Sequence, residues 1–200
     1  MMTPHQTDEF QLRSASPSDV PAILRCIRGL AEYERLAHQC VATESLLHET
    51  LFGAMPAAEV VLASRGDETA GFALWFRSYS TFLARPGIYL EDLFVFPAYR
   101  GRGLGRRFLA HLARTAVERG YGRLEWAVLD WNVDAIRFYG SLGAVPLDDW
   151  TTFRLAGDPL AALGVGQDRD PGGARLAPSG TATILRRAAP GSPNADREGP

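Results

Sequence analysis

Residues 100–106 form a glycine-spaced basic turn, RGRGLGR, which follows an apolar run and precedes an amphipathic stretch typical of a helix. Glycines let the backbone turn its N–H groups inward, and the start of a helix adds a partial positive charge. Together these features form a binding site for a pyrophosphate. A carboxylate pair, Glu91 and Asp92, precedes the turn. A phosphate cradle beside fixed carboxylates indicates an enzyme that uses a phosphorylated cofactor.

The two carboxylates lie within residues 88–96, an apolar run that is typical of a central strand. Successive side chains of a strand alternate between its two faces. We therefore expect Glu91 and Asp92 to point to opposite faces, so that one carboxylate faces the site while the other faces away. An acid on a strand can also pair with an arginine, and this alternative applies above all to Asp92.

The composition limits the classes of protein that the sequence can encode. Its 200 residues fit one domain with a tail, and a net charge of −2 gives no reason to expect nucleic acid or a membrane surface as partner. No apolar run approaches the roughly 20 residues of a membrane helix, and residues 1–10 lack the pattern of a signal peptide. Two cysteines and four scattered histidines predict neither a disulfide framework nor a metal site. We expect a cytoplasmic protein without a metal.

Hydrophobic periodicity and capping residues predict the strands and helices that must position these groups. Ser16, Thr43 and Asn132 are natural N-caps, while Gly53 and Gly143 are typical of helix ends. The predicted strands cover residues 10–13, 60–63, 72–79, 88–96, 124–129 and 151–155. The predicted helices cover residues 17–33, 44–52, 104–119 and 133–142.

The C-terminal part of the chain has a different composition. No aromatic residue follows Phe153, and residues 156–200 hold six of the 13 prolines and eight of the 20 glycines. Such a segment cannot bury enough apolar surface to offset the entropy lost on ordering. We therefore predict a flexible N-terminus over residues 1–9, one domain over 10–156 and a disordered Pro/Gly-rich tail over 157–200. An edge strand at residues 181–185 is the less favoured alternative.

The order of the elements and the glycine turn resemble the GNAT superfamily of acetyl-CoA-dependent N-acetyltransferases. Arg100, Gly103 and Gly105 meet its signature, Arg/Gln-x-x-Gly-x-Gly/Ala. Five segments resemble the diamine, or spermidine/spermine, N-acetyltransferase branch: LAEYE at 30–34, GIYLEDLFV at 87–95, YRGRGLG at 99–105, DWN at 130–132 and FYGSLGA at 138–144. The resemblance implies an α/β (α+β) GNAT fold. Its sheet would be mixed and largely antiparallel, with six to seven strands, splayed central strands and about four flanking helices.

Two other interpretations apply to the glycine turn taken alone. A Rossmann dinucleotide loop would explain the turn, and Glu125 lies at roughly the expected distance downstream. However, Arg106 stands where the third glycine belongs, and several predicted strands precede a motif that normally follows the first. An ordinary strand-to-helix turn without a ligand is the simpler alternative.

The resemblance implies the residues that bind the cofactor. Amides of the glycine turn would hold the pyrophosphate of acetyl-CoA, and the backbone of the preceding strand would pair with its pantetheine arm. The cofactor-binding residues would be Leu93, Phe94, Val95, Arg100, Gly101, Arg102, Gly103, Leu104, Gly105, Arg106, Asn132 and Ala135.

The resemblance also implies the reaction and the residues that carry it. Glu91 would be the base and Tyr139 the acid in a direct transfer of acetyl to a primary amine, within a ternary complex. The amine-binding residues would be Tyr33, Glu34, Glu91 and Glu125. A diamine or polyamine is the preferred acceptor, with a lysine analogue or other small amino compound second, and the enzyme would be a homodimer. The alternative of another class is a non-catalytic acyl-CoA sensor.

Overall fold

The computed structural model describes residues 10–165, which fall into two compact units divided after Ala144. The first unit contains the predicted motifs and the second begins at Val145. The N-terminal residues 1–9, most of the predicted tail and the alternative strand at 181–185 lie outside the described residues.

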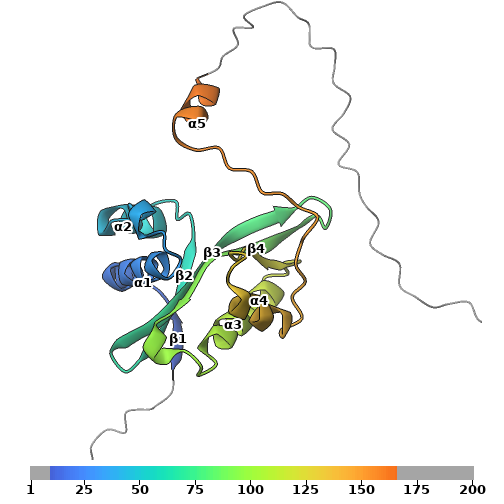
Figure 1. The fold of residues 1–200 in the computed structure, drawn as a ribbon. Coiled ribbons are helices and arrows are strands. Elements are labelled where there is room, and N and C mark those ends of the chain that lie inside the picture. Colours follow the sequence, from blue (N-terminus) through green and yellow to red (C-terminus); the bar gives the residue numbers. More distant parts are fainter. Residues whose placement is uncertain (1–9, 166–200) are drawn as a thin grey trace, which may run out of the picture. The chain divides into compact units, whose positions relative to one another are not determined.

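The first unit is built on one sheet in the strand order β1-β2-β3-β4-β5 (Figure 1). Its strands are β1 (Gln11–Ser14), β2 (Glu59–Arg65), β3 (Glu68–Ser80), β4 (Arg85–Val95) and β5 (Leu124–Trp126). Neighbouring strands from β1 to β4 are antiparallel, whereas β5 runs parallel to β4. The predicted mixed, largely antiparallel sheet is confirmed, with five strands within residues 10–165 where six to seven were expected.

Helices cover both faces of this sheet, with α1 and α2 on one face and α3 and α4 on the other (Figure 1). The helices are α1 (Val20–Tyr33), α2 (Glu44–Phe52), α3 (Leu104–Glu118) and α4 (Val133–Gly140). Short 3₁₀ turns occupy Pro17–Asp19, Ala37–Gln39 and Pro97–Tyr99. In the described part of the chain, no helix is both long and apolar enough to cross a membrane.

The predicted caps form the hydrogen bonds that start the helices. The backbone N–H of Ser16 donates to the carboxylate of Asp19 at 2.8 Å, just before α1. Thr43 Oγ1 accepts from the backbone N–H of Leu46 at 3.3 Å and so begins α2. Asn132 Oδ1 does the same for α4. These bonds fix where each of these helical segments begins, and therefore where the side chains at its first turn lie.

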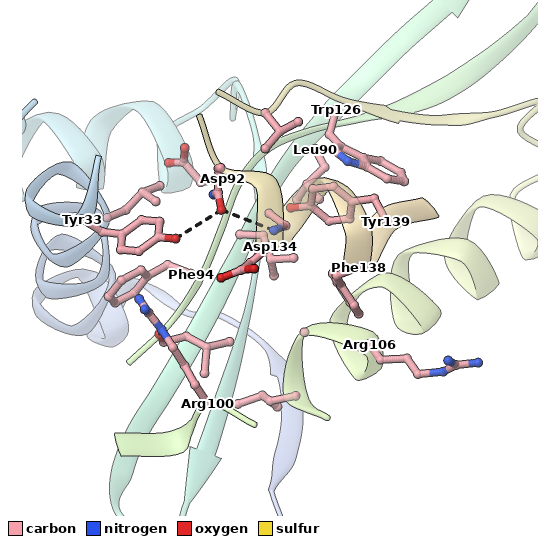
Figure 2. Close-up of a pocket in the computed structure, with 18 of the residues that line it drawn as sticks. Tyr33, Leu90, Asp92, Phe94, Arg100, Arg106, Trp126, Asp134, Phe138 and Tyr139 are labelled. Carbon is pink, nitrogen blue, oxygen red and sulfur yellow. Dashed lines mark hydrogen bonds between the residues drawn. The ribbon is translucent and has the colours of Figure 1, made fainter. Parts of the chain in front are cut away.

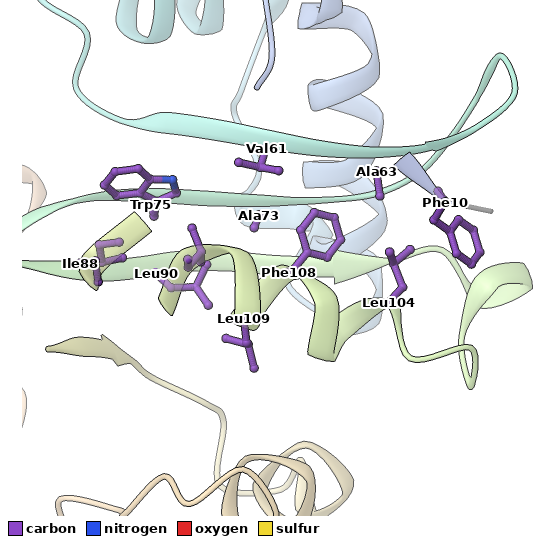
Figure 3. Packing of buried hydrophobic residues seen from close by; sticks show 13 residues of the cluster. Phe10, Val61, Ala63, Ala73, Trp75, Ile88, Leu90, Leu104, Phe108 and Leu109 are labelled. Carbon is purple, nitrogen blue, oxygen red and sulfur yellow. The ribbon is translucent and has the colours of Figure 1, made fainter. Parts of the chain in front are cut away.

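The core consists of two apolar clusters, one on each face of the sheet. Strand β2 illustrates the division, because Val60 and Leu62 pack toward α1 and α2 while Val61 and Ala63 pack toward α3. On the α3 side, Phe108 is fully buried among residues of β2, β3 and β4 (Figure 3). Burial of such a side chain contributes about 1.5–3 kcal/mol, so α3 is held firmly against β4.

The second unit differs from the prediction. Residues 151–155 were expected to form a strand, but they are irregular and exposed, and no strand pairs with them in the described ranges. Thr151, Thr152 and Phe153 favour an extended strand, yet a strand also needs a neighbour to pair with. The helix α5 (Gly157–Gly164) follows, in a segment whose composition suggested no ordered element.

A test of the fold uses the close approach of β3 to the end of β4. A β-carbon on Gly71 would overlap the carbonyl oxygen of Phe94 and lie 3.1 Å from the Cα atom of Val95. We expect Gly71→Ala to lower the free energy of unfolding by about 1–3 kcal/mol, because backbone atoms cannot move aside cheaply. Chemical denaturation measures this change.

The matched control is Gly140→Ala at the end of α4, where an added β-carbon meets no atom within 4 Å. Alanine favours helix more than glycine does, so this variant should be as stable as the parent or slightly more stable. Equal stability of the Gly71 variant and the parent would contradict the packing described for β3 and β4.

Candidate active site

The central feature of the site is the point where β4 and β5 separate. The two strands pair over only three positions, the last of which joins Leu90 to Trp126. Beyond it β4 continues to Val95, while β5 ends and the chain turns away toward α4. A cavity of about 570 Å³ opens at this point, lined by residues of α1, β4, the glycine turn, the chain after β5 and α4. The predicted splay of the central strands is confirmed.

The glycine turn forms one end of this cavity. Gly101 and Gly103 have φ values of 73° and 75°, a left-handed conformation that strains other residues. Gly103 is the N-cap of the 15-residue helix α3, and no side chain caps this helix. The turn from Gly103 to Arg106 lines the cavity. The uncapped amides and the helix dipole fit an anionic group such as a pyrophosphate.

The free side of β4 forms the adjacent wall. Residues 92–95 pair with β3 on one side, while β5 pairs with β4 only up to Leu90. Leu93, Phe94 and Val95 line the cavity along this stretch. Backbone groups on an unpaired strand edge can bind an extended ligand as another strand would. This stretch could therefore bind an arm that carries amide groups.

A β-bulge sets the positions of the two carboxylates. Leu74 of β3 pairs with Asp92 and Trp75 pairs with Leu90, so Glu91 is an extra residue in β4. Both Glu91 and Asp92 line the cavity. The bulge interrupts the regular alternation on which the expectation of opposite faces was based.

The two carboxylates nevertheless lie in different surroundings. Glu91 is exposed, whereas Asp92 is half-buried. Burial raises the pKa of Asp92 to about 6, and the negative charges of Glu91 and Glu34 contribute to the increase. Burial also raises the pKa of Glu34 above its usual range. None of the ion pairs in the described residues includes Asp92, so the alternative of an arginine partner does not apply. These carboxylates therefore favour the binding of a cation from solution.

Tyr139 lies on α4 and lines the same cavity as Asp92 (Figure 2). Its ring is half-buried and packs edge-on against Trp126, with 5.0 Å between the ring centroids. Burial raises the pKa of Tyr139, and the nearby Tyr33 and Glu34 raise it further. The phenol therefore keeps its proton at neutral pH, as a group that donates a proton must.

Tyr33 at the end of α1 connects the two sides of the cavity. Its hydroxyl donates to Asn132 Oδ1 at 3.3 Å, and Asn132 Oδ1 also accepts from the N–H of Ala135 (Figure 2). The guanidinium of Arg100 lies 4.7 Å from the centroid of the Tyr33 ring, and Arg100 Nε donates to the carbonyl of Val95. The glycine turn, β4 and α1 therefore meet at one arginine.

The structure brings together nearly all of the sequence-predicted site residues. Two of them do not line the cavity. Arg102 is exposed, and the carboxylate of Glu125 lies 2.6 Å from Arg123 Nε in an ion pair. Sequence analysis assigned no role in the site to several other lining residues, namely Leu30, Leu90, Tyr99, Trp126, Ala127, Val128, Leu129, Asp134 and Phe138. Asp92 was considered there only as one of two carboxylates on opposite faces of a strand, because no local signal shows a bulge.

Comparison with known proteins agrees with this geometry. Residues 28–144 match the model of the Acetyltransferase (GNAT) family. The chain belongs to this family. It is accordingly an N-acetyltransferase, and members of the family use acetyl-CoA.

Two relatives show how far the similarity of this acetyltransferase extends. It is 37% identical over 198 residues to the L-ornithine N5-acetyltransferase NATA1 of Arabidopsis thaliana, which covers 76% of this chain and 87% of that protein. It is 38% identical over 164 residues to the thialysine N-epsilon-acetyltransferase of Mus musculus, with coverage of 76% and 96%. Among solved structures, an integron cassette protein of V. cholerae has the same fold, with a TM-score of 0.68 at 24% identity over 78% of this chain and 98% of that one.

The surroundings of Asp92 predict how stability depends on pH. A carboxyl group whose pKa rises on folding stabilises the fold while it is protonated, and this contribution is lost as pH rises through its folded pKa. For Asp92 the loss falls between about pH 4 and pH 7 and amounts to roughly 3 kcal/mol. We expect Asp92→Asn to be more stable than the parent at pH 7 by about this amount, with little difference at pH 4.

Urea denaturation of both proteins across this pH range measures the difference. Asp134→Asn is the matched control, because Asp134 also lines the cavity but its side chain is 92% exposed. It should change the stability little at either pH. A difference between Asp92→Asn and the parent that is independent of pH would show that burial does not act on this carboxyl group.

Proposed function

We propose that the acetyltransferase transfers acetyl from acetyl-CoA to a primary amine of a small diamine or diamino acid, by direct attack in a ternary complex. The observation that carries the proposal is the pairing of an uncapped, glycine-rich helix start with a carboxylate wall on the same cavity. The first fits an anionic cofactor and the second fits a cationic amine. The names of the relatives, which act on ornithine and thialysine, agree with such an acceptor.

The cofactor-binding part of the proposal assigns acetyl-CoA to the glycine turn and β4. The amides of residues 101–106 would hold its pyrophosphate, with Arg106 as a nearby cation, and the backbone of residues 93–95 would bind its pantetheine arm. When bound, the thioester supplies an activated acetyl group. Asn132 and Ala135 at the start of α4 would close the other side.

The amine must lose a proton before it can react. An alkyl amine has a pKa of about 10.4, so forming the neutral species at pH 7 costs roughly 4.6 kcal/mol. We assign proton removal to Glu91, directly or through one water, because this carboxylate lines the cavity and is open to solvent. Asp92 and Glu34 would hold a cationic part of the substrate, a role that their shielded positions support.

We assign the acid to Tyr139. Its phenol faces the same cavity as the carboxylates, and its raised pKa keeps the proton available for a departing thiolate. Because Trp126 and Phe138 pack against the ring, the hydroxyl is held in a fixed direction. A sensor that only binds acyl-CoA would need neither an acid nor a base, so this pair favours catalysis.

The first experiment measures thiol release from acetyl-CoA over a panel of amines, with the parent and Tyr139→Phe. We expect turnover with diamines or diamino acids. Because Tyr139→Phe keeps the ring and removes the proton, kcat should fall by roughly 10²-fold or more, with an unchanged melting temperature. No turnover with any amine would contradict the proposed function. Equal rates for the parent and Tyr139→Phe would show that Tyr139 has only a packing role.

The second experiment tests the cofactor site by calorimetry with coenzyme A. Gly103→Asp places a negative charge and a side chain where the pyrophosphate should bind, so we expect no measurable affinity. Gly66→Asp is the matched control, because Gly66 also has a positive φ and open space around it but lies in the turn between β2 and β3. It should suffer similar backbone strain and keep its affinity. Loss of coenzyme A affinity in both variants, or in neither, would contradict the assignment of the pyrophosphate to the glycine turn.

A further inference from the structure

Arg35 has an unusual backbone conformation for an arginine. Its φ is 63°, in the left-handed region where glycine is the usual residue. The N–H of Arg35 donates to the carbonyl of Glu32 at 3.1 Å, and the N–H of Leu36 donates to that of Ala31 at 2.8 Å. These two bonds form a Schellman motif after α1, and Arg35 occupies its glycine position. The strain suggests that the side chain has a use.

The side chain of Arg35 does not line the cavity itself but lies against Trp131, which is the residue before the lining residue Asn132. Its guanidinium lies 5.7 Å from the centroid of the Trp131 ring. Trp131 in turn packs against Tyr33, with 5.8 Å between the ring centroids, and Tyr33 lines the cavity. The guanidinium of Arg35 therefore lies against Trp131. The contact between Trp131 and Tyr33 joins the segment before α4 to the end of α1.

Arg35 also differs from the other arginine at this end of the site. Arg100 is engaged by the Val95 carbonyl and the Tyr33 ring. Within residues 10–165 no carboxylate lies within ion-pair distance of Arg35, which is exposed. Its neighbour Glu34 is half-buried and lines the cavity. Adjacent residues therefore offer one negative and one positive group.

We propose that Glu34 and Arg35 together bind the zwitterionic head of a diamino acid: Arg35 binds its α-carboxylate and Glu34 its α-ammonium, while the distal amine accepts the acetyl group. The inference rests on the proposed function and narrows its substrate class. A guanidinium can donate two parallel hydrogen bonds to a carboxylate. A diamine has no carboxylate, and its second ammonium would be repelled by Arg35. The site should therefore select diamino acids over diamines of the same length.

The test compares two substrates that differ only in the carboxylate, L-ornithine and putrescine. We expect the parent to prefer ornithine in kcat/KM. In Arg35→Gln the ratio of kcat/KM for ornithine to kcat/KM for putrescine should fall by about 3- to 20-fold. This is the size expected for the loss of a partly exposed charged hydrogen bond. The loss should lie mainly in KM for ornithine, because the carboxylate is far from the reacting amine.

A second variant separates this role from a structural one. Arg35→Gly removes the same side chain and relieves the left-handed strain, so its melting temperature should rise by about 2–6 °C while the ratio falls as in Arg35→Gln. Ala84→Gly is the matched control, because Ala84 has a φ of 49° in the turn between β3 and β4 and does not line the cavity. It should raise the melting temperature and leave the ratio unchanged.

The outcomes separate the two proposals. A parent that acetylates both substrates equally well, or Arg35 variants that lose both activities in equal proportion, would overturn the carboxylate assignment and leave the acetyltransferase function standing. Turnover with neither substrate nor with any other amine would overturn the proposed function itself, and the inference with it. The assignment is supported if kcat/KM falls selectively for ornithine in both Arg35 variants and the melting temperature rises in Arg35→Gly.

Discussion

The parting of β4 and β5 after three paired positions is the constraint on which the rest of the site depends. Backbone groups that lose a strand partner need another one, so the edge of β4 beyond Leu90 is left with donors and acceptors for a ligand. Helix α3 packs on β4 beside this opening through Leu104, Phe108 and Leu112. The same helix begins at the glycine turn. One helix therefore covers β4 and also presents its own N-terminus to the opening.

The gathering of carboxylates at this opening carries a cost for the fold. Burial raises the pKa of both Glu34 and Asp92, and for Asp92 the negative charges of Glu91 and Glu34 raise it further. A cationic ligand would relieve both effects. Charge that destabilises the empty site is then the charge that attracts the substrate, which is a common compromise between stability and activity.

Features that depend on neighbouring residues in sequence could be predicted well. The N-caps Ser16, Thr43 and Asn132 and the glycine turn follow from local backbone chemistry, so their positions were correct. Features that depend on pairing between strands could not be predicted. The bulge beside Leu74, the ion pair of Glu125 with Arg123 and the irregular residues 151–155 are decided by which segments meet. The resemblance to a family supplied what local patterns could not, namely that these segments surround one cavity.

The bulge in β4 has a further consequence for how the site relates to its scaffold. On either side of Glu91 the ladder with β3 is regular, and Leu90 and Leu93 pack on the same face, as do Asp92 and Phe94 with their partners on β3. A strand without Glu91 would keep every one of those pairings. Glu91 is thus an extra residue in β4 that takes no part in the pairing with β3. The scaffold and this exposed carboxylate are separable, and the chemistry at that position can change without any change in the register of the sheet.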